Sequence, residues 1–214
     1  MLTIAPSVLS CDHCNLLSGV RTAEEFGLAR LHVDIMDGIF VPNISFGPQL
    51  VNDLRKHTSL KLDVHLMLQH PENFVEKFIN FGADSVAIHQ ESSGDIGGIL
   101  SFIRSKNRQA TVAINPETSP REEFLYQVDC ILVMGVHPGF SGQKFLPQTV
   151  QTVEKLAKFR DVHGLCFSIA VDGGVTIELI DELADSGADV LISGNSFFKS
   201  PLKFIEKVAG KQKI

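Results

Sequence analysis

Short apolar runs rich in β-branched residues alternate along the chain with stretches in which apolar residues recur at helical spacing. The runs that predict strands are residues 4–9, 31–36, 60–67, 85–89, 111–114, 130–134, 168–171 and 190–193. The clearest helical stretches are residues 48–56, 71–81, 147–159 and 177–186. Two of these are followed by Gly82 and Gly187, which are typical helix stops. Regular alternation of strand and helix predicts a parallel sheet.

Eight strand–helix units can close into a barrel, and no linker, charge block or low-complexity segment divides them. We therefore expect an α/β protein with a single (β/α)8 TIM barrel domain over residues 1–214. The alternative, an open doubly wound sheet, carries a glycine-rich phosphate turn after its first strand. The corresponding segment, residues 7–12, has no glycine, which favours the barrel.

Polar residues occupy every other position of the second predicted strand. Side chains alternate along a strand, so His32 and Asp34 share one face with Met36, and the residues between them are all apolar. The apolar face must pack beneath the helices, which sends His32 and Asp34 into the barrel near the carboxyl end of the strand. Residues at that end are typically catalytic. A buried histidine and carboxylate are costly unless they are paired or bind a metal.

The third and seventh predicted strands repeat this pattern. On the third, Asp63, His65 and Met67 point inward; on the seventh, Asp172 ends the inward row. One end of the barrel thus receives His32, Asp34, His65 and Asp172. For each residue alone, a hydrogen-bonded role in the core is the better interpretation. Two imidazoles and two carboxylates together, without sulfur, favour a site for one divalent ion: Zn(II), Fe(II), Mn(II) or Co(II).

Glycine-rich segments follow the last three predicted strands. They are residues 138–143, Gly173-Gly174 and Ser193-Gly194-Asn195. Glycines let backbone N–H groups approach an anion, and the loops after strands seven and eight are the usual phosphate site of this architecture. Apart from Lys144 these loops contain no Lys or Arg, so we expect backbone amides to hold most of the phosphate.

Charge and targeting signals narrow the classes of partner. The formal net charge is -6 and the basic residues are scattered, which argues against nucleic acid or an anionic membrane surface. The chain shows neither a signal peptide nor an apolar run of the roughly 18 residues that a membrane helix needs, so we expect a cytoplasmic protein. Cys11 and Cys14 form half of a redox or metal motif without a partner pair. Ordinary reduced thiols are therefore expected.

Five segments, in order along almost the whole chain, resemble the ribulose-phosphate 3-epimerase family. They are Ile4-Ala5-Pro6-Ser7-x-Leu9-Ser10-x-Asp12, His32-x-Asp34-x-Met36-Asp37-Gly38-x-Phe40-Val41-Pro42-Asn43, Asp63-Val64-His65-Leu66-Met67, Val136-x-Pro138-Gly139-Phe140-x-Gly142-Gln143 and Val171-Asp172-Gly173-Gly174. The resemblance implies conversion of D-ribulose 5-phosphate to D-xylulose 5-phosphate, a step of the pentose phosphate pathway. We also expect a homo-oligomer.

The resemblance further implies a role for each candidate residue. His32, Asp34, His65 and Asp172 would bind the metal, with Asp34 and Asp172 as the acid/base pair. The residues that would contact the sugar, the enediolate or the phosphate are Ser7, His65, Met36, Met67, Met134, Gly139, Phe140, Ser141, Gly142, Gly173, Gly174, Gly194 and Asn195.

Four positions depart from the commonest pattern of the family. Ser141 stands where glycine is usual, His137 where asparagine is frequent, Asn195 where serine is usual and Cys11 where alanine is usual. Because of Ser141 and Asn195, the family pattern does not decide which residues contact the phosphate or how the sixth loop closes.

Three other functions are consistent with parts of the pattern. An allulose 6-phosphate 3-epimerase would use the same four ligands. A non-catalytic sugar-phosphate sensor would be expected to lose Asp34 or Asp172, and both are present. A decarboxylase or lyase on a phosphate-binding barrel gives no reason for the paired His-x-Asp and His-x-Met strands.

Overall fold

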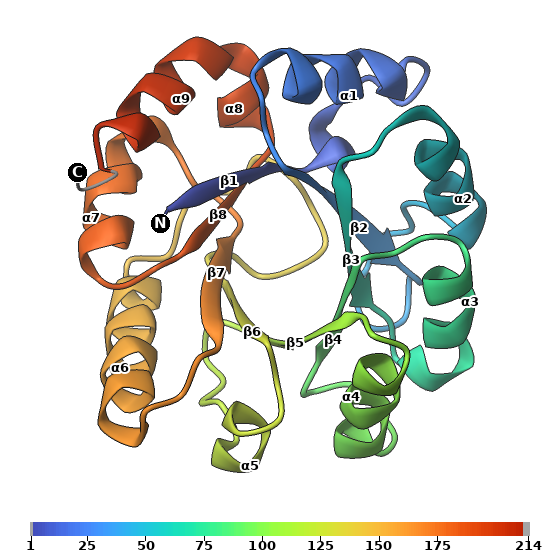
Figure 1. Cartoon of the computed structure of the whole chain (residues 1–214), viewed down its shortest axis with the longest axis vertical. Coiled ribbons are helices and arrows are strands. Elements are labelled where there is room, and N and C mark those ends of the chain that lie inside the picture. Colours follow the sequence, from blue (N-terminus) through green and yellow to red (C-terminus); the bar gives the residue numbers. More distant parts are fainter. Residues whose placement is uncertain (1, 212–214) are drawn as a thin grey trace.

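A computed structural model describes residues 2–211, which form a (β/α)8 barrel (Figure 1). Its 8-stranded sheet has the order β1-β8-β7-β6-β5-β4-β3-β2, and every neighbouring pair is parallel. A further parallel bridge between Ser7 and His32 links the two end strands. The strands are β1 (Thr3–Pro6), β2 (Arg30–Met36), β3 (Lys61–Met67), β4 (Ser85–His89), β5 (Gln109–Ile114), β6 (Cys130–Met134), β7 (Ser168–Asp172) and β8 (Val190–Ser193). The predicted barrel is confirmed.

Helices form a ring outside the strands (Figure 1). They are α1 (Leu16–Glu25), α2 (Pro48–His57), α3 (Val75–Asn80), α4 (Ile96–Ser105), α5 (Glu122–Leu125), α6 (Gln148–His163), α7 (Ile180–Asp185), α8 (Asn195–Lys199) and α9 (Pro201–Ala209). Three short 3-10 turns, η1 (Val8–Ser10), η2 (Pro71–Asn73) and η3 (Ile177–Leu179), precede helices.

Two apolar layers hold the barrel together. The larger lies between strands and helices and includes Leu31 and Leu62, both 0% exposed, as the alternation along β2 and β3 predicts. Burying each such side chain stabilises the fold by about 1.5–3 kcal/mol. The smaller lies inside the barrel and is rich in alanine, including Ala5, Ala87 and Ala113. These small side chains leave room for the larger polar groups at the carboxyl ends of the strands.

Several predicted boundaries were wrong. The first strand ends at Pro6 rather than at residue 9, because the Ser7 hydroxyl accepts a hydrogen bond from the Leu9 amide (3.3 Å) and starts the turn η1. The helix predicted over residues 71–81 is divided into η2 and α3 at Phe74, whose φ of -128° is not helical. Helix α6 runs on to His163, where Gly164 adopts the left-handed conformation (φ 61°) and ends it.

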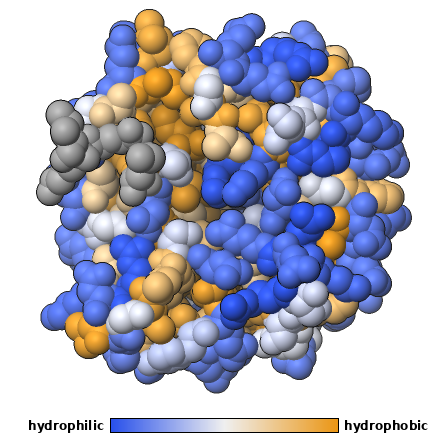
Figure 2. All heavy atoms as spheres, viewed as in Figure 1, coloured by the Kyte–Doolittle hydropathy of each residue, from blue (hydrophilic) through white to orange (hydrophobic). Residues whose placement is uncertain are grey.

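Hydrophilic side chains cover most of the face drawn in Figure 2, with smaller groups of hydrophobic ones between them. Among residues 2–211, no helix combines the length and apolar composition that a bilayer crossing demands. All four cysteines are free.

Candidate metal centre and substrate cavity

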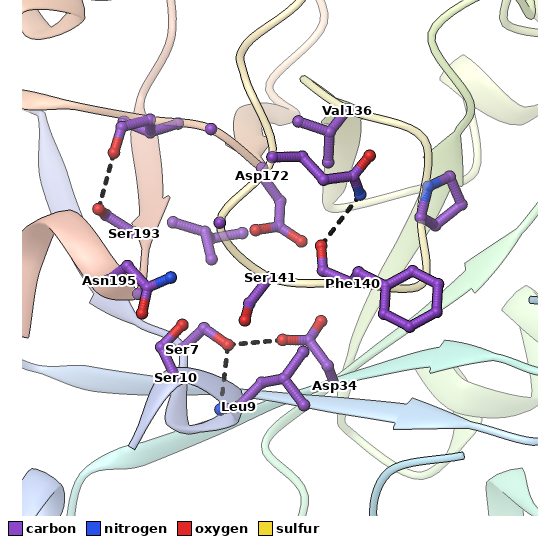
Figure 3. A pocket seen from close by; sticks show the side chains of 18 of the residues that line it. Ser7, Leu9, Ser10, Asp34, Val136, Phe140, Ser141, Asp172, Ser193 and Asn195 are labelled. Atoms are coloured by element: carbon purple, nitrogen blue, oxygen red, sulfur yellow. Dashed lines mark hydrogen bonds between the residues drawn. The ribbon is translucent and has the colours of Figure 1, made fainter. Parts of the chain in front are cut away.

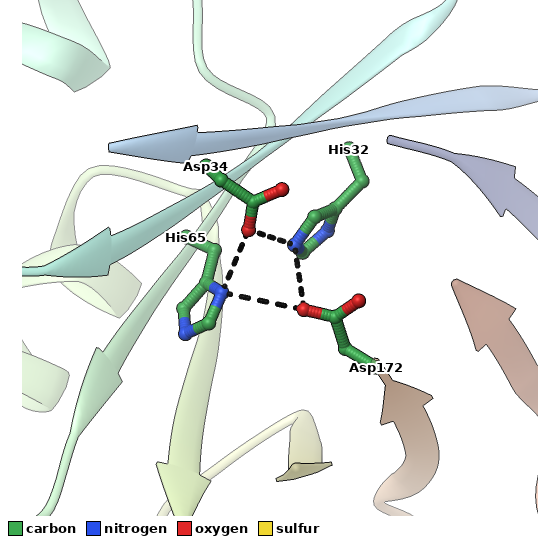
Figure 4. Close-up of side chains that lie close together, drawn as sticks. All are labelled: His32, Asp34, His65 and Asp172. Atoms are coloured by element: carbon green, nitrogen blue, oxygen red, sulfur yellow. Dashed lines mark hydrogen bonds and ion pairs between the residues drawn. The ribbon is translucent and has the colours of Figure 1, made fainter. Parts of the chain in front are cut away.

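Three strands bring the predicted metal ligands together, and the side chains point toward one another (Figure 4). His32 and Asp34 come from β2, His65 from β3 and Asp172 from the end of β7. The parallel register sets Asp34 beside His65 on the adjacent strands. All four residues are buried; Asp172 is the most exposed at 9%. The predicted convergence of these residues is confirmed.

The spacing of the four ligand atoms fits a divalent ion. Asp34 Oδ1 lies 3.2 Å from His32 Nε2 and 3.1 Å from His65 Nδ1, and Asp172 Oδ2 lies 3.7 Å from each nitrogen. Ligands at about 2.0–2.2 Å from one ion are roughly 3–3.5 Å apart. Neither ring nitrogen of His32 has a hydrogen-bond partner although both are buried. A buried, unsatisfied nitrogen aimed at two carboxylates is suited to metal ligation.

Mutual proximity perturbs the protonation of this cluster. Burial lowers the pKa of His32, but the charges of Asp34 and Asp172 outweigh it and raise the pKa to about 9. Burial dominates at His65 and lowers its pKa to about 4. Burial also raises the pKa of Asp172, and the charge of Asp34 adds to it. At Asp34 the two imidazoles outweigh burial and hold the pKa below its usual range. The environment therefore makes the two carboxyl groups unequal.

A cavity of about 320 Å³ opens above the cluster at the carboxyl ends of the strands (Figure 3). Its volume suits a small ligand. The predicted contact residues that line it are Ser7, Met36, Met67, Met134, Gly139, Phe140, Ser141, Gly142, Gly173, Gly174, Gly194 and Asn195. Asp34 and Asp172 also line it, whereas His65 does not: that imidazole is fully buried below Asp34 and reaches the site only through Nδ1.

Side-chain amides fix the loop after β6 over this cavity. Asn43 Nδ2 donates to the Gly139 carbonyl (2.7 Å), and Gln143 Nε2 donates to the carbonyls of His137 (2.6 Å) and Phe140 (3.0 Å). Asn195 also approaches the loop, since its Nδ2 lies 2.9 Å from where a Cβ on Gly142 would stand. These bonds close the loop on itself and onto the loop after β2.

The departures from the family pattern differ in their position. Ser141 and Asn195 line the cavity. His137 does not; its Nε2 lies 3.3 Å from Glu117 Oε1 at the surface, and both side chains are mostly exposed. Its substitution therefore leaves the cavity lining unchanged.

Two features of the site were missed from the sequence. Lys199 lines the cavity from the end of α8, four residues after Asn195 and so on the same face of that helix. His89, fully buried at the end of β4, places its Nε2 2.8 Å from His65 Nε2. The alternation along β4 was the available signal, because His89 shares its inward face with Ala87.

The fold and the site define a (β/α)8-barrel protein with a polar, glycine-rimmed cavity at the catalytic end of the barrel. Solved structures show the same fold at low identity. One is a tryptophan synthase α-subunit mutant from Pyrococcus furiosus (13% identity, 100% of this chain and 98% of that chain, TM-score 0.66). Another is the phosphoribosyl anthranilate isomerase of Thermus thermophilus (12%, 98% and 99%, TM-score 0.69).

Comparison with known sequences identifies the family, which the shared fold alone does not. The chain belongs to the ribulose-phosphate 3-epimerase family, whose family model matches residues 3–198. It is 40% identical to a protein named ribulose-phosphate 3-epimerase from Chlamydia trachomatis, over 96% of this chain and 90% of that one. It is 38% identical to a protein of the same name from Synechocystis, over 98% and 92% of the two chains. The expected family is confirmed.

Proposed function

We propose that this protein interconverts D-ribulose 5-phosphate and D-xylulose 5-phosphate by inverting the configuration at C3. The observation that carries the proposal is the placement of Asp34 and Asp172, which reach one cavity from β2 and β7 (Figure 3). The names of the relatives at 38–40% identity support the same reaction.

Inversion at C3 requires removal of a proton from one face of the carbon and return of a proton to the other. Two carboxyl groups on opposite sides of a bound sugar meet that need without turning the substrate. Each positioned acid or base typically contributes about 10²–10⁴-fold. Asp34 and Asp172 therefore alternate as base and acid according to the direction of the reaction.

One divalent ion, Zn(II), Fe(II), Mn(II) or Co(II), would be held by His32, Asp34, His65 and Asp172. When bound, it supplies a Lewis acid that stabilises negative charge on the oxygens of the enediolate. The residues above it have separate tasks. Ser7 Oγ donates to Asp34 Oδ2 (2.6 Å) and fixes the plane of that carboxylate. Met36, Met67 and Met134 exclude water without competing for protons.

The glycine-rich part of the lining suits a phosphate. Gly173, Gly174 and Gly194 bring backbone amides to the cavity, and their positions after β7 and β8 match the usual anion site of the barrel. Among the described residues that line the cavity, Lys199 is the basic one. Its charge supplements the amides, so the phosphate is held by more than the backbone alone.

The test is a coupled assay of protein with a defined metal content, on ribulose 5-phosphate and on allulose 6-phosphate. The proposal expects a higher kcat/KM for the pentulose phosphate, because that ratio measures discrimination between competing substrates. A higher ratio for the hexulose phosphate would assign the protein to the alternative epimerase. Turnover of neither sugar by metal-loaded protein would reject both.

A further inference from the structure

The loop after β6, residues 136–144, lines much of the cavity but has few ties to the rest of the molecule. Phe140 and Ser141 lie on it at the cavity (Figure 3). Among the described residues, no backbone–backbone hydrogen bond joins this loop to another segment. An ion pair between His137 and Glu117 ties it at the surface, but both side chains are mostly exposed, and such pairs contribute little. The position of the loop therefore depends on other contacts.

Asn43, on the loop after β2, supplies a hydrogen bond to this loop. Its Nδ2 donates to the Gly139 carbonyl (2.7 Å), while its Oδ1 accepts the Ile44 amide (2.9 Å). The two partners fix the orientation of the side-chain amide, because a carbonyl can only accept and a backbone N–H can only donate. The two loops also lie close together here, since a Cβ on Gly139 would stand 3.5 Å from Val41 Cβ. Asn43 thus holds the loop after β6 near its middle.

The segment that carries Asn43 is itself firmly held. Asp37 Oδ2 accepts the Gln69 amide (2.7 Å) and so ties this segment to the loop after β3. The backbone N–H of Asn43 donates to the Val41 carbonyl (2.8 Å). Val41 is only 2% exposed and belongs to the same apolar cluster as Met36. Asn43 is therefore a fixed point to which the less constrained loop after β6 is attached.

We propose that Asn43 is a positioning residue, which holds the loop after β6 where that loop can contact the sugar phosphate. Asn43 does not line the cavity; it acts through Gly139, and Ser141 and Gly142 follow on the cavity lining. The sugar phosphate belongs to the proposed function, on which this part of the inference rests. The attachment of the loop is a property of the protein without ligand.

The isosteric variant Asn43→Asp removes the donor alone. Its carboxylate can still accept the Ile44 amide, but its second oxygen would face the Gly139 carbonyl, and two acceptors repel. The loop can leave this position without breaking a backbone hydrogen bond to another segment. Loss of a bond of this kind corresponds to roughly a 10-fold larger population of the displaced loop.

Chymotrypsin cleavage after Phe140 measures the displaced population in protein without substrate. The protease binds an extended segment, whereas Gln143 Nε2 holds the loop folded through the carbonyls of His137 and Phe140. When opening is fast, the cleavage rate follows the open population. We expect Asn43→Asp, and Asn43→Ser, whose hydroxyl is too short to reach Gly139, to be cleaved about 10-fold faster than wild type. Cleavage of either folded variant at the wild-type rate overturns the proposal.

Steady-state kinetics supply the functional readout. In Asn43→Asp, KM for ribulose 5-phosphate should rise about 10-fold, because contacts between the loop and the substrate are weakened. The change should leave kcat near the wild-type value, since these contacts serve the substrate and the transition state alike. Co(II) affinity should also be unchanged, because the four metal ligands keep their places. An unchanged KM in Asn43→Asp contradicts the proposal.

Gln90→Glu is the matched control. Gln90 also accepts a backbone N–H (Arg121, 3.0 Å) and donates to a carbonyl (Ser119, 2.8 Å), and none of these three residues lines the cavity. The variant should lower Tm but leave KM and the cleavage after Phe140 unchanged. Equal changes in Gln90→Glu and Asn43→Asp would contradict the proposal. A wild type that shows the expected cleavage but does not turn over ribulose 5-phosphate counts only against the proposed function.

Discussion

Substitution of Gly173 by alanine probes how tightly the catalytic end of β7 is positioned. Gly173 follows Asp172 directly and has a φ of +100°, a conformation that residues with a Cβ rarely adopt. An added Cβ would stand 2.4 Å from Val136 Cγ2 and 3.2 Å from the Val136 amide nitrogen. The strain and the overlap both act on the peptide next to Asp172.

The overlap sets the expected magnitude. Carbon atoms pack at about 3.5 Å or more, so the end of β7 and the segment after β6 must separate by about 1 Å. A misplacement of about 1 Å in a catalytic group can cost on the order of 10²-fold. We therefore expect kcat of Gly173→Ala to fall roughly 100-fold. The left-handed backbone adds a stability loss of about 1–2 kcal/mol, or roughly 2–8 °C in Tm for a chain of this size.

Gly187→Ala is a matched control. Gly187 has a φ of +106°, and a Cβ there would stand 2.5 Å from Ala157 Cβ, in the outer layer between α6 and α7. The assay compares kcat, metal content and thermal denaturation of the two variants. Both should lose stability to a similar extent, and only Gly173→Ala should lose turnover. Equal kcat values in two folded variants would show that the position of the β7 end is not critical.

Three further predictions concern the charges of the site and its surroundings. Asp34→Asn and Asp172→Asn should each reduce epimerisation by at least about 10²-fold, measured on protein whose metal content is known; near-normal turnover removes that residue from the mechanism. Lys199→Met should raise KM for ribulose 5-phosphate roughly 2- to 5-fold with kcat unchanged, since an exposed charge contributes modestly; an unchanged KM places the phosphate elsewhere. The pKa of Asp37 lies below its usual value because backbone N–H groups, including that of Gln69, outweigh burial. A depressed folded pKa stabilises the protein above about pH 4, and this stabilisation is lost as pH falls through the folded value. The difference in Tm between wild type and Asp37→Asn should therefore shrink in acid, and a constant difference contradicts this.

The ligand cluster could be predicted because alternation on a strand with one apolar face leaves a single orientation for the polar residues. His32, Asp34 and His65 follow from that rule and the barrel alone. The same rule applies to His89 at the end of β4, so its inward position could also be predicted from the sequence. The contact between His89 and Glu91 could not be predicted, because the direction of the Glu91 side chain depends on the path of the loop after β4.

Local hydrogen bonds and loop paths explain the remaining differences. The end of β1 depends on the Ser7 hydroxyl, which bonds both to the Leu9 amide and to Asp34 on the adjacent strand β2. Residue composition does not show that these two hydrogen bonds end the strand at Pro6. Lys199 lines the cavity from the end of α8, which begins two residues after β8. Sequence spacing gives its helix face but not its distance from the phosphate loops.

The central claim, that two carboxyl groups act on opposite faces of C3, is tested most directly in deuterated water. Each epimer of the substrate is converted separately by metal-loaded protein, and the product is examined by NMR for deuterium at C3. With Asp34 and Asp172 as separate acid and base, the proton that is removed and the proton that is returned come from different groups. The product of either direction should then carry deuterium at C3. Substantial transfer of the original C3 hydrogen into the product would instead show a single base that serves both faces, and would contradict the proposed mechanism.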